Sequence, residues 1–136
     1  MMADKLFLEL VSPEKALVSK EVDEILAVGV DGEFGLLSGH SPFCTELKMG
    51  GLTFKSGNET ATIVMSRGFL EVSDDKVVVL AEKAEFSSDI NLEEAKSMRD
   101  EAAQIMEETK QNGGEEYLAA EKAFAYHSVR VDFANK

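Results

Sequence analysis

The hydrophobic period of the chain changes once, near Ser88, and this change constrains the fold more than any other feature. Before it, apolar residues recur at alternate positions, as in Leu6–Val11, within short runs separated by Gly, Asn, Asp and Pro. After it, apolar residues recur at steps of three and four. The first period is that of β-strands and the second that of an amphipathic α-helix. We therefore predict a β domain over residues 1–87 and a helical domain over residues 88–136.

The first domain has the pattern of many short strands. Ser56–Asn58 separates two strand-like runs and predicts a tight hairpin turn. Ser73–Asp75 predicts a second turn, and Val22–Val28 is expected to be one apolar run. Short strands punctuated by turn residues are typical of a β-sandwich. The predicted fold class is an all-β sandwich N-terminal domain followed by a C-terminal α-helical hairpin.

The second domain predicts two helices. Asn91 with Glu94 resembles a capping box at the start of the first helix, and Asn112–Gly114 is expected to end it. A second helix is expected from about Glu115. Two helices joined by a short connection form an antiparallel hairpin. The buried face of the second helix is expected to contain Leu118, Ala125, Tyr126, Val129 and Phe133.

Charge and composition exclude several classes of function. The 136 residues carry a formal net charge of −12, which argues against nucleic-acid binding because phosphates require a basic face. No apolar run approaches the roughly 20 residues that cross a bilayer, so we expect contact with a membrane only through a partner. The segment Met1–Lys5 lacks the layout of a secretory signal. The single cysteine, Cys44, fits a reducing compartment and is expected to be buried as a small apolar residue.

The sequence offers no constellation for catalysis or metal binding. His40 and His127 fall in different predicted domains, with no second ligand at metal spacing. Gly29, Gly32 and Gly35 recur every third residue and do not match a dinucleotide-binding fingerprint. We therefore predict no catalytic residue, no metal site and no cofactor.

Residues 31–43 read Asp-Gly-Glu-Phe-Gly-Leu-Leu-Ser-Gly-His-Ser-Pro-Phe, and this string resembles the signature of the F-type ATP synthase ε subunits. That signature has Gly-Glu-hydrophobic-Gly, a hydrophobic pair, proline or a small residue, and then Gly-His-Ala/Ser-Pro. Ser38 stands where proline is commoner. Residues 10–14, 68–72 and 77–82 resemble further strands of the family in the expected order, so the resemblance covers nearly the whole chain.

The resemblance implies a non-catalytic rotor-stalk subunit of a proton- or sodium-driven ATP synthase. In that family the β domain grips the γ subunit and touches the membrane ring, at the cytoplasmic face of the bacterial inner membrane. A place in the plastid stroma is left open by the sequence. The residues implied at the ring and γ contacts are Gly32, Glu33, Phe34, Gly35 and His40.

The family's hairpin either folds against the sandwich or extends into the catalytic head, where it inhibits ATP hydrolysis. Some members bind ATP through Ile/Leu-Asp-x-x-Arg-Ala near the start of the first helix. In this chain Lys96 stands where that motif has arginine, and lysine lacks the planar guanidinium that binds phosphate through two hydrogen bonds. The match therefore also fits an ordinary solvated first turn. The residues aligned with this motif are Leu92, Glu93, Lys96 and Ser97.

Two other functions remain open at this point. One is a free-standing β-sandwich protein-binding module with a helical oligomerisation hairpin, and the other is a small hydrolase. Stable association with γ distinguishes the stalk subunit from both.

Overall fold

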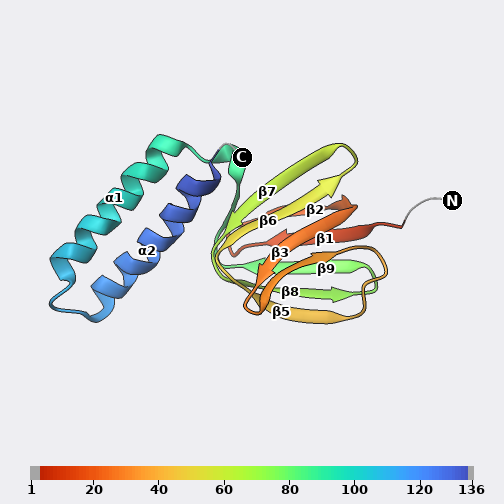
Figure 1. Cartoon of the computed structure of the whole chain (residues 1–136), viewed down its shortest axis with the longest axis horizontal. Helices are drawn as coiled ribbons and strands as arrows, with labels where there is room; N and C mark the ends of the chain where they lie inside the picture. The colour runs from red at the N-terminus through yellow and green to blue at the C-terminus, as the bar shows by residue number, and fades with distance from the viewer. Residues whose placement is uncertain (1–3, 135–136) are drawn as a thin grey trace. The chain divides into compact units, whose positions relative to one another are not determined.

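The computed structural model describes residues 4–134, so the N-terminal segment considered above lies partly outside the described residues. The chain divides into two compact units, residues 1–86 and residues 87–136 (Figure 1). We describe each unit by itself. Within residues 4–134, no helix has the length and apolar character needed to cross a membrane.

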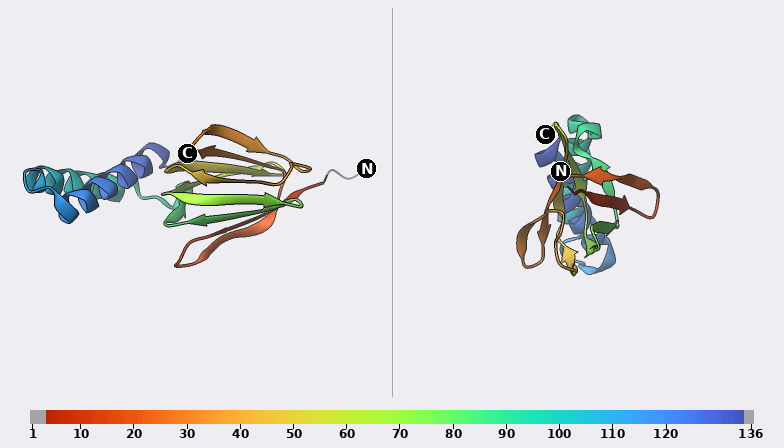
Figure 2. Two further views of the ribbon diagram at one scale, coloured as in Figure 1. Left: turned by 90° about the horizontal axis from the view of Figure 1, so that it is seen from below. Right: turned by 90° about the vertical axis from the view of Figure 1, so that its right-hand side faces the viewer.

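The β unit is one ten-stranded sheet (Figures 1 and 2). Its order is β10-β7-β6-β3-β5-β8-β9-β1-β2, and β4 pairs with β3 outside this path. The β1–β9 pair is parallel, and the other pairs are antiparallel. The strands are β1 (Leu6–Val11), β2 (Ala16–Val22), β3 (Glu24–Gly29), β4 (Gly32–Leu36), β5 (Phe43–Leu47), β6 (Gly50–Ser56), β7 (Glu59–Met65), β8 (Gly68–Ser73), β9 (Lys76–Ala81) and β10 (Ala84–Phe86).

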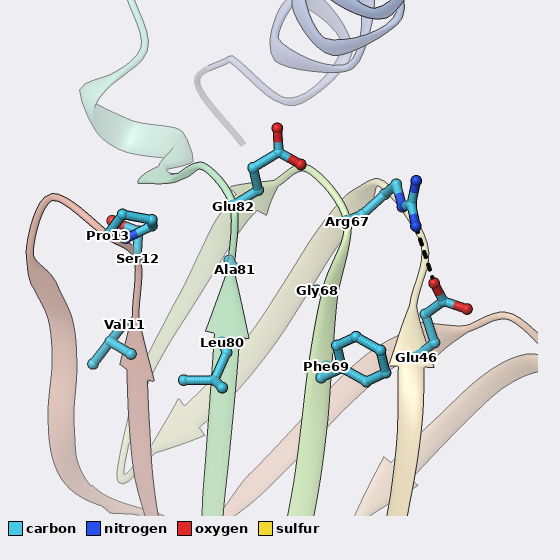
Figure 3. Close-up of a pocket in the computed structure, with 10 residues that line it drawn as sticks. All are labelled: Val11, Ser12, Pro13, Glu46, Arg67, Gly68, Phe69, Leu80, Ala81 and Glu82. Carbon is cyan, nitrogen blue, oxygen red and sulfur yellow. Dashed lines mark hydrogen bonds and ion pairs between the residues drawn. The ribbon is translucent and has the colours of Figure 1, made fainter.

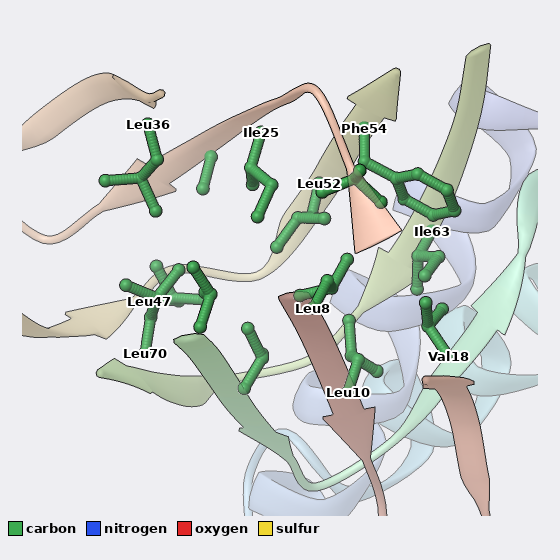
Figure 4. Close-up of a cluster of buried hydrophobic side chains, with 14 of the residues drawn as sticks. Leu8, Leu10, Val18, Ile25, Leu36, Leu47, Leu52, Phe54, Ile63 and Leu70 are labelled. Carbon is green, nitrogen blue, oxygen red and sulfur yellow. The ribbon is translucent and has the colours of Figure 1, made fainter. Parts of the chain in front are cut away.

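Alternating apolar residues on these strands form the core. Leu6, Leu8 and Leu10 are fully buried, and the residues between them face outward or are half-buried. Figure 4 shows side chains from both halves of the sheet pointing into the same interior. The predicted β-sandwich is therefore confirmed. The large, fully buried core side chains include Ile25, Leu36, Leu52, Ile63 and Leu70.

Both predicted turns are confirmed. Ser56 pairs with Glu59 across the β6–β7 turn, where Gly57 has a φ of +63°. At the β8–β9 turn, Asp74 and Asp75 have φ values of +49° and +61°. Aspartate tolerates this left-handed conformation better than most residues, which explains two consecutive aspartates in so tight a connection.

Three sequence predictions for the β unit need correction. The apolar run Val22–Val28 is divided at Asp23, whose carboxylate accepts hydrogen bonds from Lys5 Nζ (2.6 Å) and Gly57 N (2.7 Å). The segment Gly32–Leu36, which belongs to the contact loop that the family resemblance implies, is strand β4. Cys44 is exposed rather than buried, because the β5–β8 register places it opposite the exposed Glu71 on the outer face of the sheet.

The helical unit contains a short 3₁₀ turn (Ser87–Asp89), α1 (Leu92–Thr109) and α2 (Gly114–Phe133). Asn91 caps α1, because its side-chain oxygen accepts a hydrogen bond from Glu94 N (2.9 Å). Gly113 and Gly114 have φ values of +61° and +76°, which lets the chain reverse between the helices. The predicted hairpin is therefore confirmed.

The buried face of α2 includes Tyr126, as predicted, but not Leu118 or Ala125. Ala120, Tyr126 and Arg130 are buried, whereas Leu118 is 55% exposed and Ala125 is also exposed. Alanines are the buried apolar residues of α1, and small side chains let two helices approach closely. This face is therefore selected by close packing and by the ion pair of Arg130 with α1. It is not selected by the largest apolar side chains.

Candidate functional site

Gly32 and Glu33 lie at the beginning of β4, next to the β3–β4 turn. Both are exposed, and Val30 in the same turn is 44% exposed. Gly32 has a φ of +127°, a conformation that other residues rarely adopt, and this allows the tight reversal from β3. The turn therefore presents an acidic and an apolar side chain to the surroundings.

Phe34 and Gly35 have mainly packing roles in the isolated unit. Phe34 packs partly buried against the core, and its ring meets that of Phe43 edge-on at 5.4 Å between centroids. Gly35 pairs with Leu26, and a Cβ added at Gly35 would lie 3.2 Å from Leu26 Cδ2. The absence of a side chain at Gly35 thus makes room for Leu26.

His40 lies in a turn beyond the other end of β4. Its backbone N–H donates to Leu37 O (3.2 Å), and its ring Nδ1 lies 2.7 Å from Ser41 O, so Nδ1 carries the proton that donates. The His40 ring lies 5.8 Å from that of Phe43. The structure therefore places the five predicted contact residues along β4 and its following turn, with Gly32 and His40 at opposite ends, and does not gather them into one pocket.

An apolar groove on the outer face of the sheet was not predicted from the sequence (Figure 3). It has a volume of about 540 Å³ and includes Val11, Pro13, Phe69 and Leu80 in its lining. Phe69 is 60% exposed and Leu80 is 54% exposed. The strand alternation could have revealed Phe69, because it shares the solvent-facing side of β8 with Glu71.

An ion pair lies beside the groove. Arg67 donates to Glu46 Oε1 at 3.3 Å, and Glu82 also contributes to the lining (Figure 3). The groove thus combines an apolar centre with charged groups at its edge. This is the composition of a protein-binding surface rather than of a catalytic cleft.

The candidate nucleotide-binding residues are mostly solvated. Glu93, Lys96 and Ser97 are exposed, and Leu92 is half-buried. A groove of about 340 Å³ runs along the hairpin, but none of these four residues lines it. Its lining includes Met98, Ala102, Ile105, Ala119 and Ala123.

The acid that connects the two helices is Glu94, not Glu93. Arg130 Nη2 donates to Glu94 Oε1 at 3.2 Å, and Arg130 Nη1 lies 3.1 Å from His127 Nδ1 and 3.7 Å from Met98 Sδ. The Arg130 side chain is only 8% exposed. Arg130 follows Ala123 and Tyr126 at helical spacing, and this charge among apolar residues could have indicated the contact from the sequence.

One carboxyl group of the β unit has a perturbed pKa. The hydrogen bonds from Lys5 and from the Gly57 amide hold the pKa of Asp23 below its usual value. Asp23 thereby connects the N-terminal segment, the β2–β3 corner and the β6–β7 turn at one end of the sandwich.

Comparison with known proteins identifies the family. The family described as "ATP synthase, Delta/Epsilon chain, beta-sandwich domain" matches residues 5–87. The "ATP synthase epsilon chain" of Geobacter sulfurreducens is 41% identical over 135 residues, which are 99% of this chain and 97% of that protein. This chain belongs to the ATP synthase epsilon family. The resemblance carried by residues 31–43 is thereby confirmed.

Other epsilon chains agree over similar lengths. That of Nitratidesulfovibrio vulgaris strain DP4 is 40% identical over 131 residues, covering 95% of this chain and 98% of the relative. As an epsilon chain, the protein is a non-catalytic subunit of the rotary central stalk of ATP synthase. The free-standing module and the small hydrolase are therefore set aside.

Solved structures show the same fold. A chain of the Euglena gracilis mitochondrial ATP synthase, described as OSCP/F1/c-ring in rotational state 1, superposes with a TM-score of 0.77 and 23% identity. The superposition covers 92% of this epsilon chain and 78% of that one. A chain of the Tetrahymena thermophila central stalk and c-ring has a TM-score of 0.56 and 13% identity, over 67% and 73% of the two chains.

Proposed function

We propose that this epsilon chain couples γ to the membrane ring, at the cytoplasmic face of the bacterial inner membrane, and that its hairpin inhibits ATP hydrolysis. The observation that carries the γ contact is the pair of large apolar side chains, Phe69 and Leu80, that are more than half exposed on a rigid sheet.

The groove has the geometry of a docking surface. Leu80 is the register partner of both Phe69 on β8 and Val11 on β1, so three neighbouring strands contribute to one apolar patch. Aromatic and aliphatic anchors at the centre of an interface supply most of its binding free energy. A second copy of this chain is disfavoured as the occupant because each copy carries a net charge of −12. For a central-stalk subunit, the γ subunit is the partner that fits.

The β3–β4 turn is the proposed ring contact. Gly32 and Glu33 are exposed there, next to the exposed Val30. His40 lies beyond the opposite end of β4, in a turn bonded to Asp75 past the end of β8, and we assign this turn to a second γ contact apart from the groove. Phe34 and Gly35, between the two ends, support both contacts through their packing with Phe43 and Leu26.

The hairpin is proposed as a brake that reaches the catalytic head when it extends. Lys96 and Lys110 are exposed and can meet acidic segments of the head subunits. The arrangement of Leu92, Glu93, Lys96 and Ser97 does not favour a nucleotide site, because three of them are exposed and none lines the groove along the hairpin. We therefore propose regulation without a bound cofactor.

Substituting Phe69 tests the γ contact. Phe69→Glu removes the central aromatic ring and introduces a charge, so the dissociation constant for the α/β/γ catalytic complex is expected to rise about 30-fold, or about 2 kcal/mol. The matched control is Thr60→Glu, which adds the same charge at an exposed position of β7. Equal affinities for wild type and Phe69→Glu would exclude this groove as the γ site.

Truncation tests the brake. ATP hydrolysis by the α/β/γ complex is measured with the full chain and with a chain ending at Ser87, both at saturating concentration. Faster hydrolysis with the truncated chain is expected. Equal rates, with both chains bound, would refute inhibition by the hairpin and leave the coupling role intact.

A further inference from the structure

The carboxylate of Asp75, in the β8–β9 turn, binds the turn that contains His40, although the two turns are far apart in the sequence. Asp75 Oδ1 accepts a hydrogen bond from Gly39 N at 2.7 Å. Asp75 Oδ2 accepts a second hydrogen bond from the Ser38 hydroxyl at 3.1 Å. Both carboxylate oxygens are therefore used by two consecutive residues of one turn, across a sequence separation of 36 and 37 residues.

The β8–β9 turn holds Asp75 in a fixed position. Its backbone carbonyl accepts a hydrogen bond from Phe7 N at 2.8 Å, which ties the turn to β1. Its φ of +61° belongs to the tight reversal between β8 and β9. The carboxylate thus projects from an anchored backbone rather than from a free loop.

The Leu37–His40 turn has the geometry of a type II turn. His40 N donates to Leu37 O, and Gly39, the third of the four residues, has a φ of +87°. Proline is favoured at the second position of such a turn because its ring presets φ. This chain has Ser38 at that position. The hydrogen bond from Ser38 to Asp75 restrains the turn, as a proline ring at position 38 would.

The restrained turn presents an apolar side chain. Leu37 is 59% exposed, nearly as much as Phe69. Four hydrogen bonds order Ser38, Gly39 and His40 while Leu37 faces solvent. A segment already held in its binding conformation loses less entropy when a partner binds. A rigid turn with an exposed leucine therefore fits a protein contact better than a free loop does.

We propose that Asp75 is a positioning residue that holds the Leu37–His40 turn in the conformation that binds γ, a restraint that a proline at position 38 could also supply. The inference rests on the proposed γ contact and adds the residue that organises it. Asp75 itself makes no contact with γ in this proposal.

The decisive variant is Asp75→Gly. Glycine adopts the positive φ of this position without strain, so the variant deletes the carboxylate and leaves the β8–β9 turn favourable. The matched control is Asp74→Gly, which makes the same change one residue earlier, where φ is +49°. We expect the affinity of the full chain for the α/β/γ complex to fall about tenfold for Asp75→Gly and to stay within about twofold for Asp74→Gly.

A rescue variant separates positioning from general structure. Ser38→Pro presets the turn without the carboxylate, so Asp75→Gly with Ser38→Pro is expected to recover affinity to within about threefold of wild type. The order of the turn is read independently from the heteronuclear NOE of the Gly39 amide in the free chain. That NOE is expected to fall in Asp75→Gly and to recover in the double variant.

The outcomes distinguish this inference from the function on which it rests. Equal affinity of wild type and Asp75→Gly would overturn the inference alone, as would a loss of affinity that Ser38→Pro fails to restore. Failure of the wild-type chain to bind the α/β/γ complex would overturn the proposed γ contact and this inference together. Loss with rescue, and no loss in Asp74→Gly, supports the inference.

Discussion

Gly68 is the position of the β unit where a single added methyl group is expected to be most harmful. Gly68 begins β8 and is the register partner of Ala81 on β9. A Cβ at this position would collide with the carbonyl oxygen of Leu80, and it would lie 2.8 Å from Met65 Cε and 3.2 Å from Ala81 Cα. Met65 can move its terminal methyl group, but the Leu80 carbonyl belongs to the backbone of a paired strand. The substitution Gly68→Ala must therefore displace β8 from β9.

The magnitude follows from the nature of the collision. Overpacking in a well-filled core costs about 1–3 kcal/mol, and a backbone collision belongs at the upper end of that range. In a domain of this size, a loss of about 2–3 kcal/mol lowers the melting temperature by about 10 °C or more. Because Gly68, Phe69 and Leu80 all line the outer groove, the same displacement is expected to weaken γ binding.

Gly35→Ala is the matched control. The added Cβ would lie 3.8 Å from the Ile25 carbonyl, which is an ordinary van der Waals distance. It would also lie 3.2 Å from Leu26 Cδ2, which is a tight contact. Leu26 is 43% exposed and can rotate away, so the free energy of unfolding should change by less than about 1 kcal/mol.

Urea unfolding of the chain ending at Ser87, followed by far-UV circular dichroism, isolates the β unit. Tyrosine fluorescence of the full chain checks the hairpin separately, because the two tyrosines, Tyr117 and Tyr126, both lie on α2 and the chain has no tryptophan. An unfolding midpoint for Gly68→Ala equal to that of wild type would refute the reasoning. Equal losses for Gly68→Ala and Gly35→Ala would refute it as well.

Two further predictions concern ionised side chains. Because its folded-state pKa is depressed, Asp23 contributes stability that is present above the usual carboxyl range and is lost as pH falls through the folded pKa. Asp23→Asn should therefore flatten the acid side of the stability profile, measured as urea midpoints between about pH 7 and pH 3; an unchanged acid slope would contradict this assignment. In the hairpin, Glu94→Ala removes one hydrogen-bonded carboxylate from the buried Arg130 side chain and should speed amide hydrogen exchange in α1 and α2 about tenfold, whereas Glu93→Ala should change it little. Equal exchange rates in these two variants would show that the ion pair does not hold the helices together.

Local patterns in the sequence were sufficient for the fold class, for the buried face of β1, for two of the turns and for the two helices, but not for every strand. The alternation in β1 identified its buried face, and the turn residues at Gly57 and Asp75 identified two hairpins. Such signals are contained within a few consecutive residues, and backbone geometry converts them directly into structure.

The candidate contacts depended on pairing between distant segments. The groove joins Val11, Phe69 and Leu80 only because β9 lies between β1 and β8. Cys44 was assigned wrongly because its apolar neighbours suggested burial, whereas the register with β8 decides which face it occupies. Strand register of this kind is not encoded in any short window of sequence.

The prediction of the buried face of α2 was partly wrong for a different reason. Hydrophobicity favoured Leu118, but the helices approach through small residues such as Ala102 and Ala120, and Arg130 is held by Glu94. A helix pair selects its contact by shape and by satisfying buried charge, and these are properties of both helices together.

The same composition of the hairpin bears on its proposed role. Within α1 and α2, the buried apolar side chains are the small Ala95, Ala102 and Ala120 and the large Tyr126. Burying a methyl group contributes about 1 kcal/mol, whereas a buried leucine or isoleucine contributes about 1.5–3 kcal/mol. The β unit has many such large buried residues, so the proposed opening of the hairpin costs less free energy than disrupting the β unit. The proposed roles, a β unit that transmits torque and a hairpin that opens, require this difference in buried apolar area, and Glu94–Arg130 is an ion pair between the helices that such opening would break.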